Sequence, residues 1–242
     1  MSLNDLAWEK LFKKYNIIDE IEKNGQILIS ADKIREYREP RLMTKSDHSI
    51  NLPKVFSRNH LSILPVSRGD YIISSFDAYE AFPEPNGETK RIAAPSYIQS
   101  LMPQYIISET IALNCANACG ILREFLEDEQ LLPTVNGRMG SGSFDFNIHT
   151  KNGSRRIPVC NSQIEIDAAY EGVEFLSIFE AKRDISEDFI IRQLYYPFRT
   201  WSNRITKTVK TIFLVFSNGT FNLYEYAFDD INNYNSIRLE RI

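Results

Sequence analysis

The chain has 242 residues, of which 43% are hydrophobic and 25% charged, so its composition is that of a globular protein and argues against extended disorder. No apolar run reaches the roughly 18–20 residues that cross a membrane, and the N-terminus lacks a signal-peptide pattern. Three cysteines without a CxxC pair argue against a disulfide framework or a zinc site. We therefore expect a cytoplasmic protein with no membrane partner. Because the net charge is −4, a nucleic-acid partner would require a local concentration of positive charge.

The first 81 residues have the pattern of a small module of short helices and strands. Apolar spacing and capping residues predict helices over 3–15, 17–23, 30–37 and 53–59, strands over 26–29, 61–66 and 71–76, and a turn at 67–70. A strand, two helices and a hairpin follow one another in winged helix-turn-helix proteins. The alternative is a small α+β cap with a solvated charged face.

Positive charge is concentrated in this module. Between residues 41 and 68, five basic residues occur with one acid, Asp47. Such a stripe can bind phosphate groups despite the negative total charge. The candidate DNA-binding residues are Arg41, Lys45, Lys54, Arg58 and Arg68, together with Arg138 from a glycine-rich segment further along.

A change in composition predicts the domain boundary. Residues 82–95 contain Pro83, Pro85 and Gly87 among mostly polar residues, which is typical of a linker. We therefore expect an N-terminal recognition module over 1–81, a linker over 82–95, and a second domain over 96–242.

The second domain alternates between helical and strand patterns. We expect helices over 95–127, with a break near Gly120 or none, and over 187–202, and a glycine-rich loop over 135–143. A polar turn is predicted to run through Arg156. Strands are predicted over 144–148, 163–169, 174–181, 208–216, 221–228 and 236–242. A meander that leads into a crossover helix predicts an α/β (α+β) fold, with a mixed central sheet flanked by helices.

Two of these strands end in acidic residues. Ile164–Asp167 ends in a carboxylate, and Ile178–Lys182 ends in Glu180, one spacer and Lys182. Side chains alternate along a strand, so Glu180 and Lys182 share a face, and pairing of the strands would bring Asp167 to them. Two carboxylates can hold a hard divalent cation, and an ammonium group beside them can position a water. This combination favours metal-assisted hydrolysis of phosphodiester bonds.

A Glu-x-Lys triplet alone is weak evidence, because a second one, Glu88-Thr89-Lys90, occurs in the predicted linker. The triplet at 180–182 differs in context, since it ends an apolar strand one hairpin after Asp167. Two other acids, Asp145 and Glu165, remain alternatives for the first carboxylate.

With these residues in this order, the chain resembles the PD-(D/E)xK nuclease superfamily over roughly 96–216, although Ile166 stands where the motif has proline. The resemblance implies a restriction-endonuclease-like core and a Mg²⁺ ion, replaceable by Mn²⁺, held by Asp167, Glu180 and the carbonyl of Ala181. It also implies that Lys182 orients or deprotonates the attacking water. Glu109 would serve a second metal or a ligated water, and Gln193 would position the lysine or the DNA backbone.

A basic N-terminal module on such a core resembles a type II restriction endonuclease. That resemblance implies site-specific cleavage of double-stranded DNA by a homodimer, alongside a cognate DNA methyltransferase that acts on the same site. The alternatives are a structure-specific repair or junction nuclease, a non-catalytic DNA-binding protein on a nuclease-like fold, and an enzyme unrelated to nucleic acids.

Overall fold

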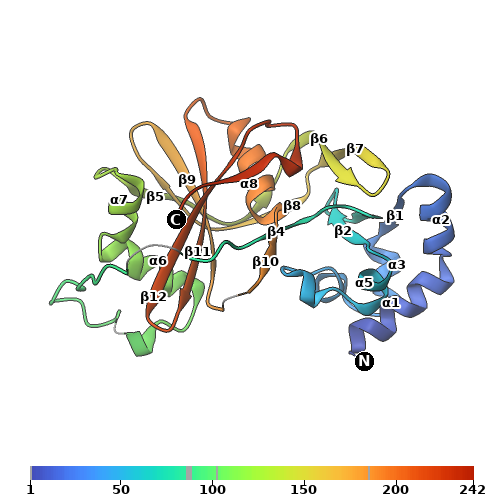
Figure 1. Cartoon of the computed structure of the whole chain (residues 1–242), viewed down its shortest axis with the longest axis horizontal. Coiled ribbons are helices and arrows are strands. Elements are labelled where there is room, and N and C mark those ends of the chain that lie inside the picture. Colours follow the sequence, from blue (N-terminus) through green and yellow to red (C-terminus); the bar gives the residue numbers. More distant parts are fainter. Residues whose placement is uncertain (1, 86–88, 102, 185) are drawn as a thin grey trace.

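The computed structural model describes residues 2–85, 89–101, 103–184 and 186–242. Figure 1 shows an elongated molecule with the N-terminal helices and strands, in blue, at one end and a large sheet with its helices at the other. Within the described residues, no helix is both long and apolar enough to cross a membrane.

The N-terminal region contains every helix and strand predicted for it, together with one short helix and one 3-10 turn that were not predicted. It contains helices α1 (Leu3–Lys14), α2 (Ile17–Asn24), α3 (Ala31–Arg35), α4 (Pro40–Met43) and α5 (Lys54–Arg58) and the 3-10 turn η1 (Ser49–Asn51). Strands β1 (Ile27–Ser30), β2 (Ser62–Pro65) and β3 (Asp70–Ser74) form an antiparallel sheet in the order β1-β3-β2. Ser30 caps α3, as predicted, by accepting a hydrogen bond from the Lys33 amide. Edge-to-face contacts of Trp8, Phe12 and Phe56 hold the helices together.

The larger region is built on a six-stranded mixed sheet, which confirms the expected α/β class. Its strands are β5 (Leu132–Gly140), β8 (Gln163–Glu171), β9 (Phe175–Lys182), β11 (Thr208–Ser217), β12 (Thr220–Phe228) and β13 (Ile237–Arg241). The spatial order is β13-β12-β11-β9-β8-β5. Strands β9 and β11 run parallel, because helix α8 (Arg192–Ser202) and the segments around it return the chain across the sheet between them. The other neighbouring strands are antiparallel.

Helices cover both faces of this sheet. Leu113 of α6 (Glu109–Ala118) and Leu122 of α7 (Ile121–Leu126) pack in one cluster with Phe179 of β9. Tyr195 of α8 packs in another cluster with Ile178, the neighbour of Phe179 on the same strand. Because successive side chains of a strand point to opposite faces, β9 is buried on both sides. Glu180 and Lys182 follow Ile178 at intervals of two, toward the end of this strand.

Two predictions for the second region are wrong. Residues 135–143 are largely strand, because β5 pairs with β8 over most of its length despite its glycines. Edge strands tolerate glycine, and a bulge beside Gly137, whose φ is +86°, absorbs its conformation. The expected polar turn through Arg156 lies instead within β7 (Gly153–Cys160), which forms a hairpin with β6 (Ser143–Thr150).

Helix boundaries also differ from prediction. The helical stretch expected from residue 95 begins at Glu109, where Ser108 Oγ accepts from the Ile111 amide, and the break at Gly120 is confirmed by its φ of +78°. Among the described residues between 95 and 108, the only helical element is the 3-10 turn η2 (Pro103–Tyr105). The helix expected from Glu187 begins at Arg192, because Asp188–Ile190 forms strand β10 and pairs with β4 (Tyr79–Ala81).

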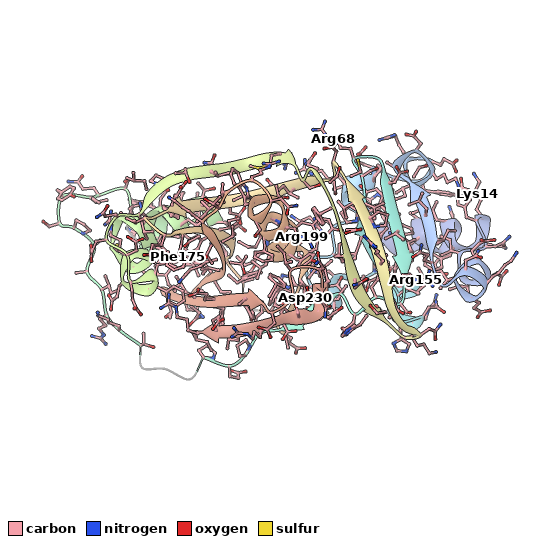
Figure 2. The ribbon with its side chains drawn as sticks, turned by 90° about the horizontal axis from the view of Figure 1, so that it is seen from above. Lys14, Arg68, Arg155, Phe175, Arg199 and Asp230 are labelled. Atoms are coloured by element: carbon pink, nitrogen blue, oxygen red, sulfur yellow. The ribbon has the colours of Figure 1, made fainter. Side chains whose placement is uncertain are left out.

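The two regions are joined by direct hydrogen bonds. The Cys160 amide donates to the Val66 carbonyl at 2.8 Å, and the Tyr196 hydroxyl donates to the Pro65 carbonyl at 3.0 Å. Figure 2 shows the β6–β7 hairpin, which carries Arg155, lying next to the N-terminal region. In the predicted linker 82–95, the Phe82 amide donates to the Glu187 carbonyl, so this segment begins attached to the larger region. Its residues 86–88 lie outside the described part.

Candidate active site

A cleft of about 550 Å³ lies between the N-terminal region and the exposed end of the large sheet. It contains most of the residues that the sequence singled out, brought together from segments far apart in the chain. From the large region its lining includes Glu109, Arg138, Asp167, Glu180, Lys182 and Gln193. From the N-terminal region it includes Arg35, Glu39, Arg41, Lys45, Asp47 and Arg68.

The floor of the cleft is the point where β8 and β9 separate. Their ladder runs from Glu171–Leu176 to Ala168–Phe179 and stops there. On the other side of β8, a bulge opposite Val135 and Gly137 falls at Asp167 and Ala168. The Ala181 amide therefore donates to Asp167 Oδ2, at 2.8 Å, rather than to a β8 carbonyl. Asp167 thus bridges the fork between the two strands, next to Glu180.

Glu180 is the most buried acid of the cleft, with 8% of its surface exposed. Its Oε1 accepts hydrogen bonds from Lys182 Nζ at 2.6 Å and from Gln193 Nε2 at 2.5 Å. Gln193 lies in the first turn of α8, so the start of this helix is tied directly to the acid. The amide oxygen of Gln193 is buried and has no hydrogen-bond partner among the described residues.

Lys182 has a second acidic neighbour. Asp47 Oδ2, from the segment before η1, lies 3.6 Å from Lys182 Nζ. The ammonium group is therefore held between a carboxylate of its own strand and a carboxylate of the N-terminal region.

The electrostatics of the cleft reflect its burial. Desolvation raises the pKa of Glu180 to about 7, and the charges of Asp167 and Asp47 add to this effect against the opposing pull of Lys182. Desolvation also raises the pKa of Asp167, although the Ala181 amide and Lys182 oppose it. Burial disfavours the ammonium form of Lys182, but Glu180 and Asp47 outweigh it and raise its pKa. The lysine is therefore a cation at neutral pH and is suited to orienting a water or a phosphate oxygen rather than to accepting a proton.

The structure separates the predicted residues into two groups. Four of the six basic candidates, Arg41, Lys45, Arg68 and Arg138, line the cleft with the five expected catalytic and metal-binding residues Asp167, Glu180, Lys182, Glu109 and Gln193. Ala181 lines it as well. Lys54 and Arg58 do not line the cleft, and Arg58 instead forms an ion pair with Glu9 of α1. Lys54 and Arg58 are close to the other basic residues in sequence, but they lie on α5, which packs against α1.

The two alternative first carboxylates have other partners. Asp145 lies on the β6–β7 hairpin, where it forms an ion pair with Arg156, and it does not line the cleft. Glu165 borders the cleft but is exposed and lies 3.3 Å from Arg138 Nε. Asp167 is the acid that contacts the Glu180 strand.

Two cleft residues were missed from the sequence. Asp47 could have been suspected as the one acid within the basic stripe. Arg192 precedes Gln193, and its guanidinium lies over the Tyr196 ring, 5.9 Å from its centre. Among the described residues, Arg41, Arg68 and Arg192 have no carboxylate within 4.0 Å. These three arginines give the cleft positive charge that no acid neutralises directly.

The donor set fits a hard cation with few protein ligands. In the described parts of the chain, no group of three or more His, Cys, Asp and Glu side chains is arranged to hold a metal. Magnesium, however, is often bound by one or two carboxylates, with waters and substrate phosphates completing its shell. The structure provides Asp167 and Glu180 for this, and neither Asp167 Oδ1 nor Glu180 Oε2 receives a hydrogen bond from a described residue.

Comparison with known proteins divides the chain at nearly the same place as the fold. Residues 5–73 match DUF6996 and residues 74–241 match DUF6997, both domains of unknown function. No curated protein and no solved structure matches the chain. Because the second match covers more than half of its residues, the chain belongs to the DUF6997 family of domains of unknown function.

Proposed function

We propose that this chain is a Mg²⁺-dependent endonuclease that hydrolyses phosphodiester bonds of double-stranded DNA at specific sites. The observation that carries the proposal is the junction of Asp167, Glu180 and Lys182 in a cleft that also contains arginines without acidic partners. Carboxylates and a lysine suit metal-assisted hydrolysis, and unneutralised arginines suit a phosphate backbone.

The order of elements supports assignment to the PD-(D/E)xK fold. Helices α6 and α7, strands β5, β8 and β9, helix α8 and strand β11 occur in this order, with the β6–β7 hairpin inserted after β5 and the short strand β10 before α8. The acidic residues lie on the second and third strands of this series, and the last strand runs parallel to the third. This is the helix, three-strand, helix, strand order expected from the resemblance, with β5 in place of the predicted first strand.

The candidate catalytic and metal-binding residues each have a role in this proposal. Asp167, Glu180 and the Ala181 carbonyl hold Mg²⁺, or Mn²⁺ in its place, and the bound ion supplies Lewis acidity and lowers the pKa of a water. Lys182 orients the attacking water and offsets negative charge on the phosphate. Gln193 holds Glu180 in place through its 2.5 Å hydrogen bond, and Glu109 serves a further ion or a ligated water from the first turn of α6.

The N-terminal region is the proposed recognition module. Its β1-β3-β2 sheet and preceding helices are compatible with a winged helix, and Arg41, Lys45 and Arg68 extend from it to the cleft. We propose cleavage of both strands by a homodimer, since two strands require two sites. A cognate methyltransferase acting on the same sequence would belong to such a restriction system, and cleavage of methylated and unmethylated DNA would test that part.

The direct test is digestion of a set of plasmids in Mg²⁺ by the wild type and by Lys182→Ala. Lys90→Ala is the matched control, because Lys90 belongs to the other Glu-x-Lys triplet and forms an exposed ion pair with Glu124. Discrete fragments from the wild type and Lys90→Ala, but not from Lys182→Ala, would support the proposal. Cleavage restricted to branched DNA would instead indicate a junction nuclease. Sequence-specific retention without cutting in Mg²⁺ or Mn²⁺ would indicate a DNA-binding protein, and neither binding nor cutting would reject the proposal.

A further inference from the structure

A short segment of the N-terminal region, residues 46–49, is fastened to the large region next to the cleft. The Ile190 amide donates to the Asp47 carbonyl at 2.9 Å, and the Tyr79 hydroxyl donates to the Ser46 carbonyl at 2.9 Å. His48 Nδ1 lies 2.5 Å from the Asp188 carbonyl, and the Ser49 amide donates to Asp188 Oδ1 at 2.8 Å. We call residues 46–49 the strap. Four hydrogen bonds to β4 and β10 hold the strap against the large region.

The side chain that the strap carries into the cleft is Asp47. Its carboxylate is 15% exposed and Lys182 is 18% exposed, so the contact of 3.6 Å between them is largely shielded from water. Lys45 also approaches Asp47, at 3.8 Å, but its side chain is 72% exposed, so solvent screens this second contact more strongly. The Asp47–Lys182 contact is therefore the stronger of the two.

The geometry points to Asp47 as a positioning residue for Lys182, so that the site is incomplete without the N-terminal region. This inference rests on the proposed nuclease function for its purpose, but the pairing itself can be tested without catalysis. Glu180 Oε1 already serves both Lys182 and Gln193, and Glu180 is also a proposed ligand of a cation. If Glu180 were the only partner of Lys182, the attraction between them would weaken whenever the Glu180 carboxylate bound a metal cation. Asp47 supplies a second, independent anchor that keeps the ammonium in the cleft.

The charged groups around Lys182 explain why the anchor must come from outside the sheet. Glu180 lies on the same strand and Asp167 on the neighbouring strand, and both already make hydrogen bonds at the floor of the cleft. Asp47 approaches from the other wall. A carboxylate in that position competes with DNA phosphates for the cleft, so its placement there is costly for simple DNA binding and is better explained by a role at the lysine.

The test compares Asp47→Asn with Asp47→Glu, which keeps the charge, and with Asp229→Asn, which removes an acid that is paired with Arg238 and does not line the cleft. Plasmid cleavage at saturating DNA should fall about 10- to 100-fold in Asp47→Asn, as expected for a misplaced catalytic group. Its DNA affinity should be unchanged or higher, and Asp47→Glu should recover part of the rate. Asp229→Asn should behave as the wild type.

A second measurement does not depend on cleavage. Acetylation of Lys182 by an N-hydroxysuccinimide ester, followed by peptide mass spectrometry of the metal-free proteins, reports how firmly the amine is held. Labelling should rise several-fold in Asp47→Asn and stay near the wild-type level in Asp47→Glu and Asp229→Asn.

The two measurements separate the possible failures. If the wild type cuts DNA but Asp47→Asn equals it in both cleavage and labelling, or cuts faster, the positioning role is wrong. If Asp47→Asn loses thermal stability and DNA affinity together with its cleavage, the role is structural and the inference fails. If the wild type does not cut DNA, the proposed function fails, and the labelling alone decides whether Asp47 anchors Lys182.

Discussion

Two ion pairs on β-strands, Glu180–Lys182 and Asp145–Arg156, differ sharply in their surroundings. Glu180 and Lys182 lie at the end of a central strand, 2.6 Å apart, with side chains 10% and 18% exposed. Asp145 and Arg156 are diagonal neighbours across the β6–β7 hairpin, with side chains 41% and 72% exposed. The first pair shares its site with two further carboxylates, Asp167 and Asp47, whereas the second is solvated. Burial and crowding, not the presence of an ion pair, mark the candidate active site.

The largest expected contrast is in catalysis. Asp167→Asn should reduce the cleavage rate by about 10²–10⁴-fold, because it removes a proposed cation ligand at the strand fork. Asp145→Asn should leave the rate within about twofold, since Asp145 is paired with Arg156 away from the cleft. Single-turnover cleavage of one plasmid measures both. An inactive Asp145→Asn beside an active Asp167→Asn would transfer the role of first carboxylate to the hairpin.

The next contrast is in stability against pH. The pKa of Glu180 is raised to about 7 in the folded protein from an ordinary value of 4.5, so the folded state binds this proton more tightly than the unfolded state. The resulting stabilisation is fully present below pH 4.5 and is lost as the pH rises to about 7. Glu180→Gln does not titrate, so its stability relative to the wild type should increase across this window, by up to about 3 kcal/mol.

Urea unfolding at pH 4.5, 6 and 8 would measure this change. The amide oxygen of glutamine can still accept a hydrogen bond from Lys182, and the attraction of Lys182 for the ionised carboxylate already contributes to the pKa of Glu180, so the trend with pH follows that pKa. A stability difference that stayed constant between pH 4.5 and 8 would show that burial does not govern the pKa of this acid.

A smaller contrast is expected in DNA binding. Arg68→Ala should weaken binding about 3- to 10-fold and reduce the slope of log affinity against log salt by about 1, because it removes one proposed phosphate contact. Arg156→Ala should change neither quantity, since its guanidinium is paired with Asp145. Fluorescence anisotropy over a salt series in Ca²⁺ tests both variants without cleavage. Equal losses in the two variants would place DNA over the hairpin as well as the cleft.

The smallest effect concerns the hairpin pair itself. A double-mutant cycle of Asp145→Asn and Arg156→Ala should give a coupling energy below about 1 kcal/mol, falling further in high salt, as is usual for exposed ion pairs. Thermal unfolding of the four proteins at low and high salt provides the values. A coupling energy above about 2 kcal/mol that did not fall in high salt would show that the Asp145–Arg156 pair is not weakened by solvent.

Prediction from sequence succeeded where local signals were strong and consistent. Apolar spacing located α1, the glycine at position 25 marked the end of α2, and the Ser30 cap located α3, while the buried runs of β9 and β11 were recognisable from their composition. It failed at β5, because three glycines between residues 137 and 142 favour a loop, and the pairing with β8 that makes this segment a strand is a long-range contact. It failed similarly at β10, where pairing with β4 overrides a helical pattern.

The sequence by itself determined the mixed α/β class, the basic stripe and the acid-ended strands that carry Asp167, Glu180 and Lys182, because each follows from composition or from periodicity within one segment. The tertiary structure decided which charged residues meet. It placed Arg41, Lys45 and Arg68 at the cleft but left Lys54 and Arg58 outside it, and it delivered Asp47 to Lys182 across 135 positions of chain. Such contacts depend on how separate elements pack, and no local pattern encodes the position of one element on another.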